Sequence, residues 1–280
     1  MADIMCLPPP LMRVVDKYMR RAEIWVQLPG DQKDRFWKMD NPDGTESFTA
    51  GEIVMFTEQS CLLAAASVDD GLIEEFRAKF RTDWERNNTS PFQGRDFAKT
   101  IGEYIVWIDR IFFFGLITRP AREAGGELRA QQYLFTLKFD ILLDDWEGNE
   151  LHGAFDSTTG TFRVAMWQRS GEPQPFDQVL CTVIHELAHV YLGILTREHS
   201  ATNYLRDIYQ NSGHGAQFHR LLGSVFALLH EWLPNMTRLG ELAAQHEDSM
   251  ISALAVPLIS EAAARAYIRD NPLRLRAYRV

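Results

Sequence analysis

The sequence predicts an α+β fold in which long helices flank a small antiparallel sheet. Two changes in hydrophobic period indicate this. Apolar residues recur at helical spacing from Ile101, and the pattern ends before Pro120. From Tyr133 to Ile141 apolar and polar residues alternate with a period of two, which is typical of a half-buried strand. Helical spacing returns from Val179 onward, so the sheet should lie between helices in chain order.

Two further strands are predicted before the second helical region. Leu151–Phe155 and Phe162–Trp167 flank the turn-forming residues 157–160, so they should pair as a hairpin. Residues 171–175, which include one glycine and two prolines, then lead to Asp177. We expect Asp177 to cap the N-terminus of the following helix.

The composition is that of a globular protein. The chain has 280 residues, 46% hydrophobic and 24% charged, so it can bury a sizeable core. Its net charge of −9 argues against a surface that binds nucleic acid over much of its area. The three cysteines are too few and too scattered for a disulfide framework. No signal-peptide pattern or apolar run of about 18 residues is present, so we expect an intracellular protein (nucleus or cytoplasm) without a membrane partner.

The most informative stretch is the motif His-Glu-x-x-His at residues 185–189. On a helix, His185 and His189 lie on one face, one turn apart, and two such imidazoles can bind one divalent metal ion. Glu186 points about 100° around the helix from His185. Its carboxylate could therefore reach a metal-bound water without coordinating the metal itself.

The context of the motif favours a functional purpose. Apolar residues surround it on what should be a broad buried stripe, and burying two histidines and a glutamate there without partners would cost several kcal/mol. The stripe consists of Val179, Leu180, Val183, Ile184, Leu187 and Val190. The alternative is a set of core histidines satisfied by hydrogen bonds alone.

A second segment completes a recognisable pattern. Residues 213–222 form a glycine-flanked loop that opens another apolar helix. Ile184–His189 together with Gly213-His214-Gly215-x-x-Phe218 resembles the SprT-like (Spartan-type) zinc metallopeptidases, over roughly residues 100–235. In that family a His-Gly-x-x-Phe-like segment carries the third metal ligand. The loop between His189 and His214 is longer here than in compact members of the family.

The resemblance implies a site and a function. His185, His189 and His214 would bind Zn²⁺, and Glu186 would act as the general base of a zinc-dependent metalloendopeptidase that hydrolyses peptide bonds of protein substrates. The implied fold is a minimal zincin-like core: a helix, a small antiparallel sheet, the motif helix and the third-ligand helix. Such a peptidase can add an extended substrate to an exposed sheet edge, and Phe162–Trp167 is our candidate strand.

Other functions remain open on the sequence alone. A zinc enzyme acting on a small amide, or a metal-stabilised interaction module without turnover, would use the same residues, although an intact Glu186 argues against the module. Family members that cleave DNA-crosslinked proteins commonly carry a cysteine-rich zinc ribbon. All three cysteines here precede His185, so a ribbon of four cysteines cannot follow it. This absence and the negative charge disfavour DNA as a partner.

Three segments are expected along the chain. Residues 1–95 are predicted as a helical N-terminal extension of unknown role, 96–235 as the SprT-like catalytic domain, and 236–280 as a helical C-terminal extension. The first boundary rests on Asn87–Pro91, a polar stretch ending in proline. The C-terminal extension ends in a basic segment that could contact an acidic partner, although such tails are usually only solvated.

Several other residues could bind a metal but lack convergent spacing. We interpret Cys181 as a buried hydrophobe, His219 as a surface or supporting imidazole, and His246 as part of a solvated helix face. Acidic residues provide the third ligand in other zincins. The remaining alternatives are His199, Glu198, Asp207 and the thiol of Cys6.

Overall fold

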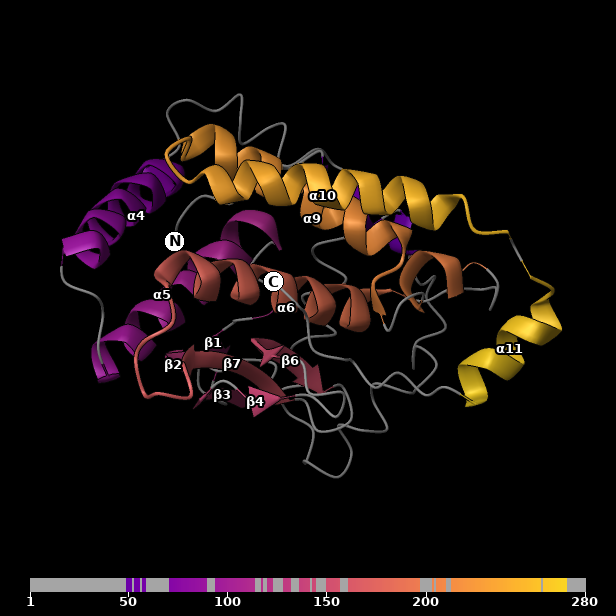
Figure 1. Ribbon diagram of the computed structural model, residues 1–280, viewed down its shortest axis with the longest axis horizontal. Helices are drawn as coiled ribbons and strands as arrows, with labels where there is room; N and C mark the ends of the chain where they lie inside the picture. The colour runs from indigo at the N-terminus through magenta and orange to yellow at the C-terminus, as the bar shows by residue number, and fades with distance from the viewer. Residues whose placement is uncertain are drawn as a thin grey trace.

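The computed structural model (Figure 1) describes a set of helices and short strands. The described residues are 49–58 (apart from 52 and 56), 71–89, 94–113, 117, 120–122, 128–131, 136–141, 143–144, 150–156, 161–196, 203, 205–209, 213–257 and 259–270. The helices are α4 (Gly71–Thr89), α5 (Gly94–Phe112), α6 (Phe176–Leu195), the π-helix η1 (Leu205–Tyr209), α9 (Ala216–Trp232), α10 (Thr237–Leu254) and α11 (Glu261–Asp270). The strands are β1 (Pro120–Arg122), β2 (Leu128–Gln131), β3 (Thr136–Ile141), β4 (Leu143–Asp144), β5 (Glu150–Leu151), β6 (Gly153–Asp156) and β7 (Thr161–Trp167).

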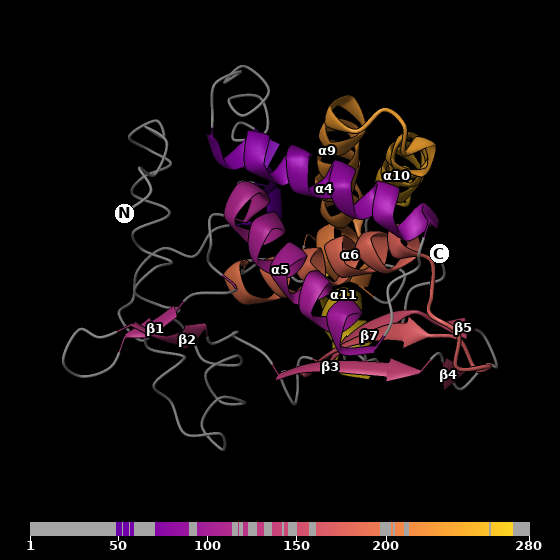
Figure 2. The ribbon, with the colours of Figure 1, turned by 90° about the vertical axis from the view of Figure 1, so that its left-hand side faces the viewer.

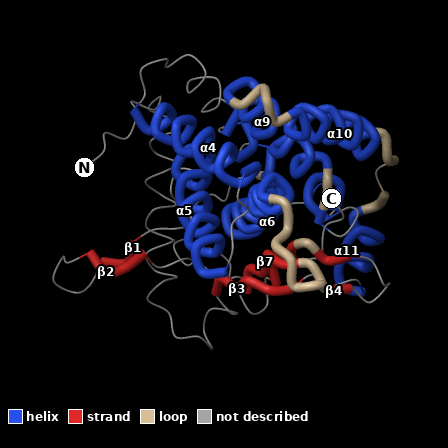
Figure 3. The backbone as a smooth tube through the Cα atoms, turned by 60° about the vertical axis from the view of Figure 1, so that its left-hand side comes forward, coloured by secondary structure: helices blue, strands red, loops and turns tan. Residues whose placement is uncertain are grey.

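Helix α6 lies at the centre of this arrangement. It contacts β6 and β7 on one side, α9 on the other, and α5 alongside. Figures 2 and 3 show β3, β4 and β7 beneath α6, the helices α9 and α10 above it, and the β1-β2 pair off to one side. From residue 178 to residue 192 every side chain of α6 is buried, because the helix is apolar on nearly all its faces. The structure is therefore α+β, as the sequence predicts.

The three-stranded sheet has the order β3-β7-β6. β6 and β7 pair antiparallel, which confirms the predicted hairpin. β3 runs parallel to β7, so the prediction of a purely antiparallel sheet is wrong for this pair. Residues 142–160, which include β4, β5 and β6, supply the long connection that a parallel pair requires. The alternating pattern of β3 reports which face is buried and carries no information about the direction of its neighbour.

Two helix boundaries differ from the prediction. α5 starts seven residues before Ile101 and ends at Phe112, well short of Pro120. The buried carboxylate of Asp109 accepts hydrogen bonds from the backbone N–H of Ile117 at 3.1 Å and 3.2 Å, a contact beyond the end of the helix that the apolar spacing does not reveal. At α6 the N-cap residue is Pro175 and no side chain caps the helix. Asp177 lies inside the first turn, where a carboxylate still favours the helix dipole.

The hydrophobic core is continuous across both predicted segment boundaries. On α4, which extends through the predicted connector to Thr89, Phe76 makes edge contacts with Tyr104 of α5 and Trp232 of α9. Phe80 of the same helix contacts Phe176 at the start of α6. Leu239 and Leu242 of α10 belong to the same buried cluster. The division into three segments stays a prediction, but the described helices share one core.

The described part of 49–58 also contributes to this core, since Ile53 and Val54 are completely buried members of its cluster. Thr57 donates a hydrogen bond of 3.2 Å to the hydroxyl of Tyr191 on α6. Residues 1–48 of the predicted N-terminal extension lie outside the described residues. Among the described helices, none has the length and apolar character needed to cross a membrane.

Substituting Phe76 by Ala tests whether α4 belongs to the common core. Removing a fully buried aromatic ring should lower the free energy of unfolding by about 3–5 kcal/mol. Urea denaturation followed by fluorescence and circular dichroism measures this, with Ile251→Ala as the control because Ile251 is 57% exposed. An unchanged midpoint for Phe76→Ala would show that α4 folds independently of the rest.

Candidate metal centre

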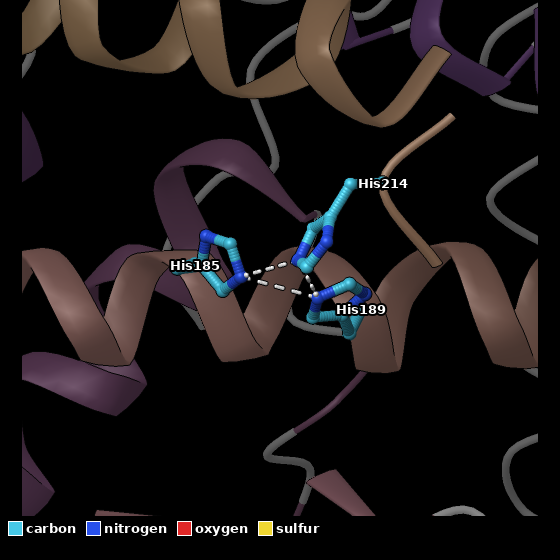
Figure 4. A group of neighbouring side chains, drawn as sticks. All are labelled: His185, His189 and His214. Carbon is cyan, nitrogen blue, oxygen red and sulfur yellow. Dashed lines mark hydrogen bonds between the residues drawn. The ribbon is translucent and has the colours of Figure 1, made fainter. Parts of the chain in front are cut away.

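Three histidines converge beside α6 (Figure 4). His185 and His189 project from one face of α6, and His214 reaches them from the loop before α9. The three Nε2 atoms lie 3.1 Å from one another in every pair. His185 and His189 are buried and His214 is half-buried. The structure thus brings together the three residues that the resemblance implies as ligands.

Hydrogen bonds alone cannot satisfy this triangle. Each Nε2 atom is either a donor carrying a proton or an acceptor with a lone pair. With three atoms and two roles, at least one of the three contacts must pair two donors or two lone pairs. A cation removes this conflict, because all three nitrogens can direct lone pairs at it. The interpretation of the motif as hydrogen-bonded core histidines is therefore disfavoured.

The distances fit a transition-metal ion. Two nitrogens that share a tetrahedral zinc ion at about 2.0–2.1 Å lie roughly 3.3–3.4 Å apart, close to the separations observed. Among the described residues, these three form the one cluster of potential ligands that could hold a metal ion. Imidazole nitrogen suits zinc and several neighbouring divalent metals.

The protonation state also suits metal binding. Burial lowers the pKa of His185 and of His189 well below the ordinary histidine value, and the neighbouring imidazoles lower both further. The two rings are therefore neutral at physiological pH, and neutral imidazole is the form that binds metals. No proton has to be removed from either ring before an ion binds.

Phe218 supports all three rings. It is fully buried, stacks on His189 with ring centroids 4.2 Å apart, and meets His185 and His214 edge-on at 4.8 Å and 4.9 Å. Its position one turn after His214 on α9 places it beneath the rings. Phe218 therefore anchors α9 against the three rings.

The glycines that flank His214 shape the loop. Gly213 has a φ of 105°, a conformation that other residues rarely adopt. At Gly215 a Cβ atom would lie only 2.3 Å from the backbone carbon of Asp207, because η1 passes directly against it. Gly215 therefore makes room for η1. Single-turn π-helices are frequent at functional sites.

The alternative ligands do not join the three histidines. Asp207 is buried and forms a two-pronged ion pair with Arg206, with distances of 2.6 Å and 3.1 Å. Cys181 is buried, as expected for a hydrophobe, and burial raises the pKa of its thiol to about 12. Three other candidates lie outside the described residues: Cys6, Glu198 and His199.

The side chain of Glu186 projects from α6 toward β6, at the edge of the sheet. It is 1% exposed and accepts a hydrogen bond from the backbone N–H of Phe155 on β6. Its Oε1 atom is buried and has no hydrogen-bond partner in the structure. Burial raises the pKa of this carboxyl to about 8, and the Phe155 hydrogen bond opposes the rise. A bare Cβ at Gly153 would lie 3.0 Å from the Glu186 Cγ, so the absence of a side chain there makes room for the carboxylate.

Two further histidines lie behind the site, and the sequence patterns do not reveal their role. His219 is buried and its ring donates a hydrogen bond to the backbone carbonyl of His214. The interpretation of His246 as part of a solvated face is wrong, since this residue is 1% exposed. Its spacing from Leu239 and Leu242, seven and four residues earlier, places it on the apolar face of α10 and is the signal that indicates its burial.

Comparisons with known proteins add no relative. No family model, no curated protein and no solved structure matches the chain. The metal centre therefore rests on the geometry of the residues described above.

Removing His214 should weaken metal binding and leave the fold intact in the absence of metal. A tight ligand at about 1,000 times its Kd stabilises a fold by about 4 kcal/mol, and His214→Ala should lose most of this. Thermal melting with zinc and with chelator measures it. The expected result is a lower Tm than wild type in zinc and an equal Tm in chelator. Equal shifts on adding zinc would exclude His214 as a ligand.

Proposed function

We propose that the chain is a zinc-dependent metallopeptidase with a SprT-like, zincin-type catalytic core. The observation that carries this proposal is the placement of Glu186: a buried carboxylate, next in sequence to a histidine of the metal cluster, held at the edge of a sheet. A structural metal site has no need of such a carboxylate. The order of α5, the sheet, α6 and α9 also agrees with the core that the family resemblance implies.

The three histidines would hold the ion and Glu186 would move the proton. When bound, zinc supplies positive charge that polarises a substrate carbonyl, lowers the pKa of a water to about 7, and favours the ionised form of Glu186. Glu186 then accepts a proton from the attacking water and passes it to the nitrogen of the leaving amine. The hydrogen bond from Phe155 orients the carboxylate, and its second oxygen is available for this transfer.

The neighbouring strand offers a place for an extended substrate. Ala165 donates its N–H to the carbonyl of His152 at 2.8 Å, and the pairing of Gly153 with Val164 follows. Hydrogen-bonded and non-bonded pairs alternate in an antiparallel ladder, so the backbone groups of Gly153 and Phe155 point away from β7. β6 is an edge strand of the described sheet, and its outer side faces the Glu186 carboxylate.

This geometry corrects the strand expected to bind substrate. Phe162–Trp167 corresponds to β7, which has β3 on one side and β6 on the other, so no edge is left for a peptide. β6 takes that role in our proposal. A peptide added along β6 would use main-chain hydrogen bonds and would bring its carbonyl groups past Glu186.

Glu186→Gln should retain the metal and lose hydrolysis. The amide cannot accept a proton from water, so the rate should fall by about 10²–10⁴-fold, the range of a general base. Cleavage of an unfolded protein, followed by electrophoresis and mass spectrometry together with zinc content, measures this. A variant that keeps wild-type activity would exclude Glu186 as the base.

Gly153→Ala should impair the same site through crowding. The new methyl group would lie 2.5 Å from Cγ2 of Thr182 and 3.1 Å from Oε1 of Glu186. We expect a loss of about 1–3 kcal/mol in stability and slower hydrolysis, with zinc retained. Gly193→Ala on α6 is the matched control, since nothing lies within 4 Å of its Cβ position. Equal activity in the two variants would argue against the assigned position of Glu186.

The choice of substrate separates this proposal from its alternatives. A peptidase should cleave an unfolded protein at internal bonds, whereas an enzyme for small amides should leave it intact. An interaction module should bind zinc without turnover. Adding single-stranded DNA to the same assay tests whether DNA stimulates cleavage.

A further inference from the structure

We propose that His219 and His246 position the third histidine of the metal centre and so determine how tightly the site holds its ion. The inference rests on the metal centre of the proposed function and adds two residues that do not contact the ion. One of them, His246, comes from α10, which the sequence predicts to be part of a C-terminal extension.

The side chains of His246 and His219 and the backbone carbonyl of His214 form a continuous chain of hydrogen bonds. The His219 ring donates to the backbone carbonyl of His214. Its Nδ1 atom lies 2.9 Å from Nδ1 of His246. A neutral imidazole carries one N–H and one lone pair. We assign the Nε2–H of His219 to the carbonyl, which leaves its Nδ1 lone pair to accept a hydrogen bond from Nδ1–H of His246.

His214 needs such support more than the other two ligands do. His185 and His189 are fixed by a buried helix, whereas His214 stands in a loop, one residue before the N-cap Gly215. The first backbone bond of α9 runs from His219 to the carbonyl of Gly215 at 3.2 Å, so the carbonyl of His214 lies just outside the helical ladder. The His219 ring fixes this carbonyl, and with it the backbone from which the His214 ring projects.

His246 is itself held rigidly. Its ring stacks on Phe226 with centroids 5.6 Å apart and meets Phe218 edge-on at 6.3 Å. Gly223 of α9 lies beside His246: a methyl group added at Gly223 would be 3.7 Å from the Cβ atom of His246. Phe218 also supports the three metal-site rings, so the pair and the metal centre share one aromatic wall. Burying a polar ring among aromatic side chains costs free energy unless its polar atoms are hydrogen-bonded, as His246 is to His219.

The test measures metal binding in variants that keep the size of the ring. Residues that orient metal ligands typically contribute 10–100-fold in metal affinity. His246→Phe and His219→Phe should raise the Kd for zinc by about this factor, measured by competition with a chromogenic chelator. His246→Asn retains an N–H donor and should recover part of the loss. The d–d absorption of bound Co²⁺ should change in the Phe variants, because it reports ligand geometry.

His230→Phe is the matched control. His230 lies on the same interface of α9 and α10, with its ring 2.9 Å from the Cβ position at Gly240, and burial leaves its Nδ1 without a partner. The His230→Phe substitution therefore changes the packing between α9 and α10 and leaves the hydrogen bond to the His214 loop in place. Its zinc Kd and cobalt spectrum should equal those of wild type.

The outcomes are distinguishable. Wild-type zinc affinity and cobalt spectra in both His219→Phe and His246→Phe would overturn the inference, as would an equal loss in His230→Phe. If a Phe variant fails to fold by circular dichroism, His246→Leu and His219→Leu, which also lack a hydrogen-bonding side chain, decide in its place, and wild-type zinc affinity with an unchanged cobalt spectrum in these two would overturn the inference. Absence of zinc binding by the wild type would overturn the metal centre itself. Zinc binding without hydrolysis would contradict the proposed peptidase and leave this inference standing.

Discussion

The conflict among three imidazole nitrogens is the constraint on which the rest of the site depends. Three Nε2 atoms at 3.1 Å cannot all be satisfied by hydrogen bonds to one another, and an ion resolves the conflict. Three features hold the rings in place: the helix α6, which is buried on nearly all sides, the fully buried Phe218, and Gly215, which leaves room for η1. Each feature has little reason to exist without the cluster.

The sheet and the outer helices serve this centre from opposite sides. β6 holds the carboxylate of Glu186 through one backbone N–H, and Gly153 leaves room for it. On the other side, α9 carries Phe218 beneath the rings and α10 packs behind α9. Because α4 and α10 share the core of α6, the parts expected to be appendages help to keep the site rigid.

Features that depend on residues near in sequence are predictable here, and contacts across long separations are not. The spacing of His185 and His189 predicts that these two share one face, whereas the third member of the cluster, His214, is implied by the family resemblance and not by spacing. The period-two pattern of β3 cannot reveal its parallel pairing with β7, because alternation reports burial and leaves direction open. The end of α5 depends on a contact between Asp109 and Ile117. The burial of His246 depends on packing against the partner helix α9, which carries His219. Apolar spacing does not encode the Asp109 contact, and for His246 its spacing from Leu239 and Leu242 indicates burial without identifying the partner.

We propose that His185, His189 and His214 together bind one zinc ion, and X-ray absorption at the zinc edge can test this binding. One zinc per chain is expected, with nitrogen and oxygen neighbours at about 2.0–2.1 Å and the outer scattering of three imidazole rings. A sulfur neighbour at about 2.3 Å, or a spectrum that fits two imidazoles or fewer, would contradict it.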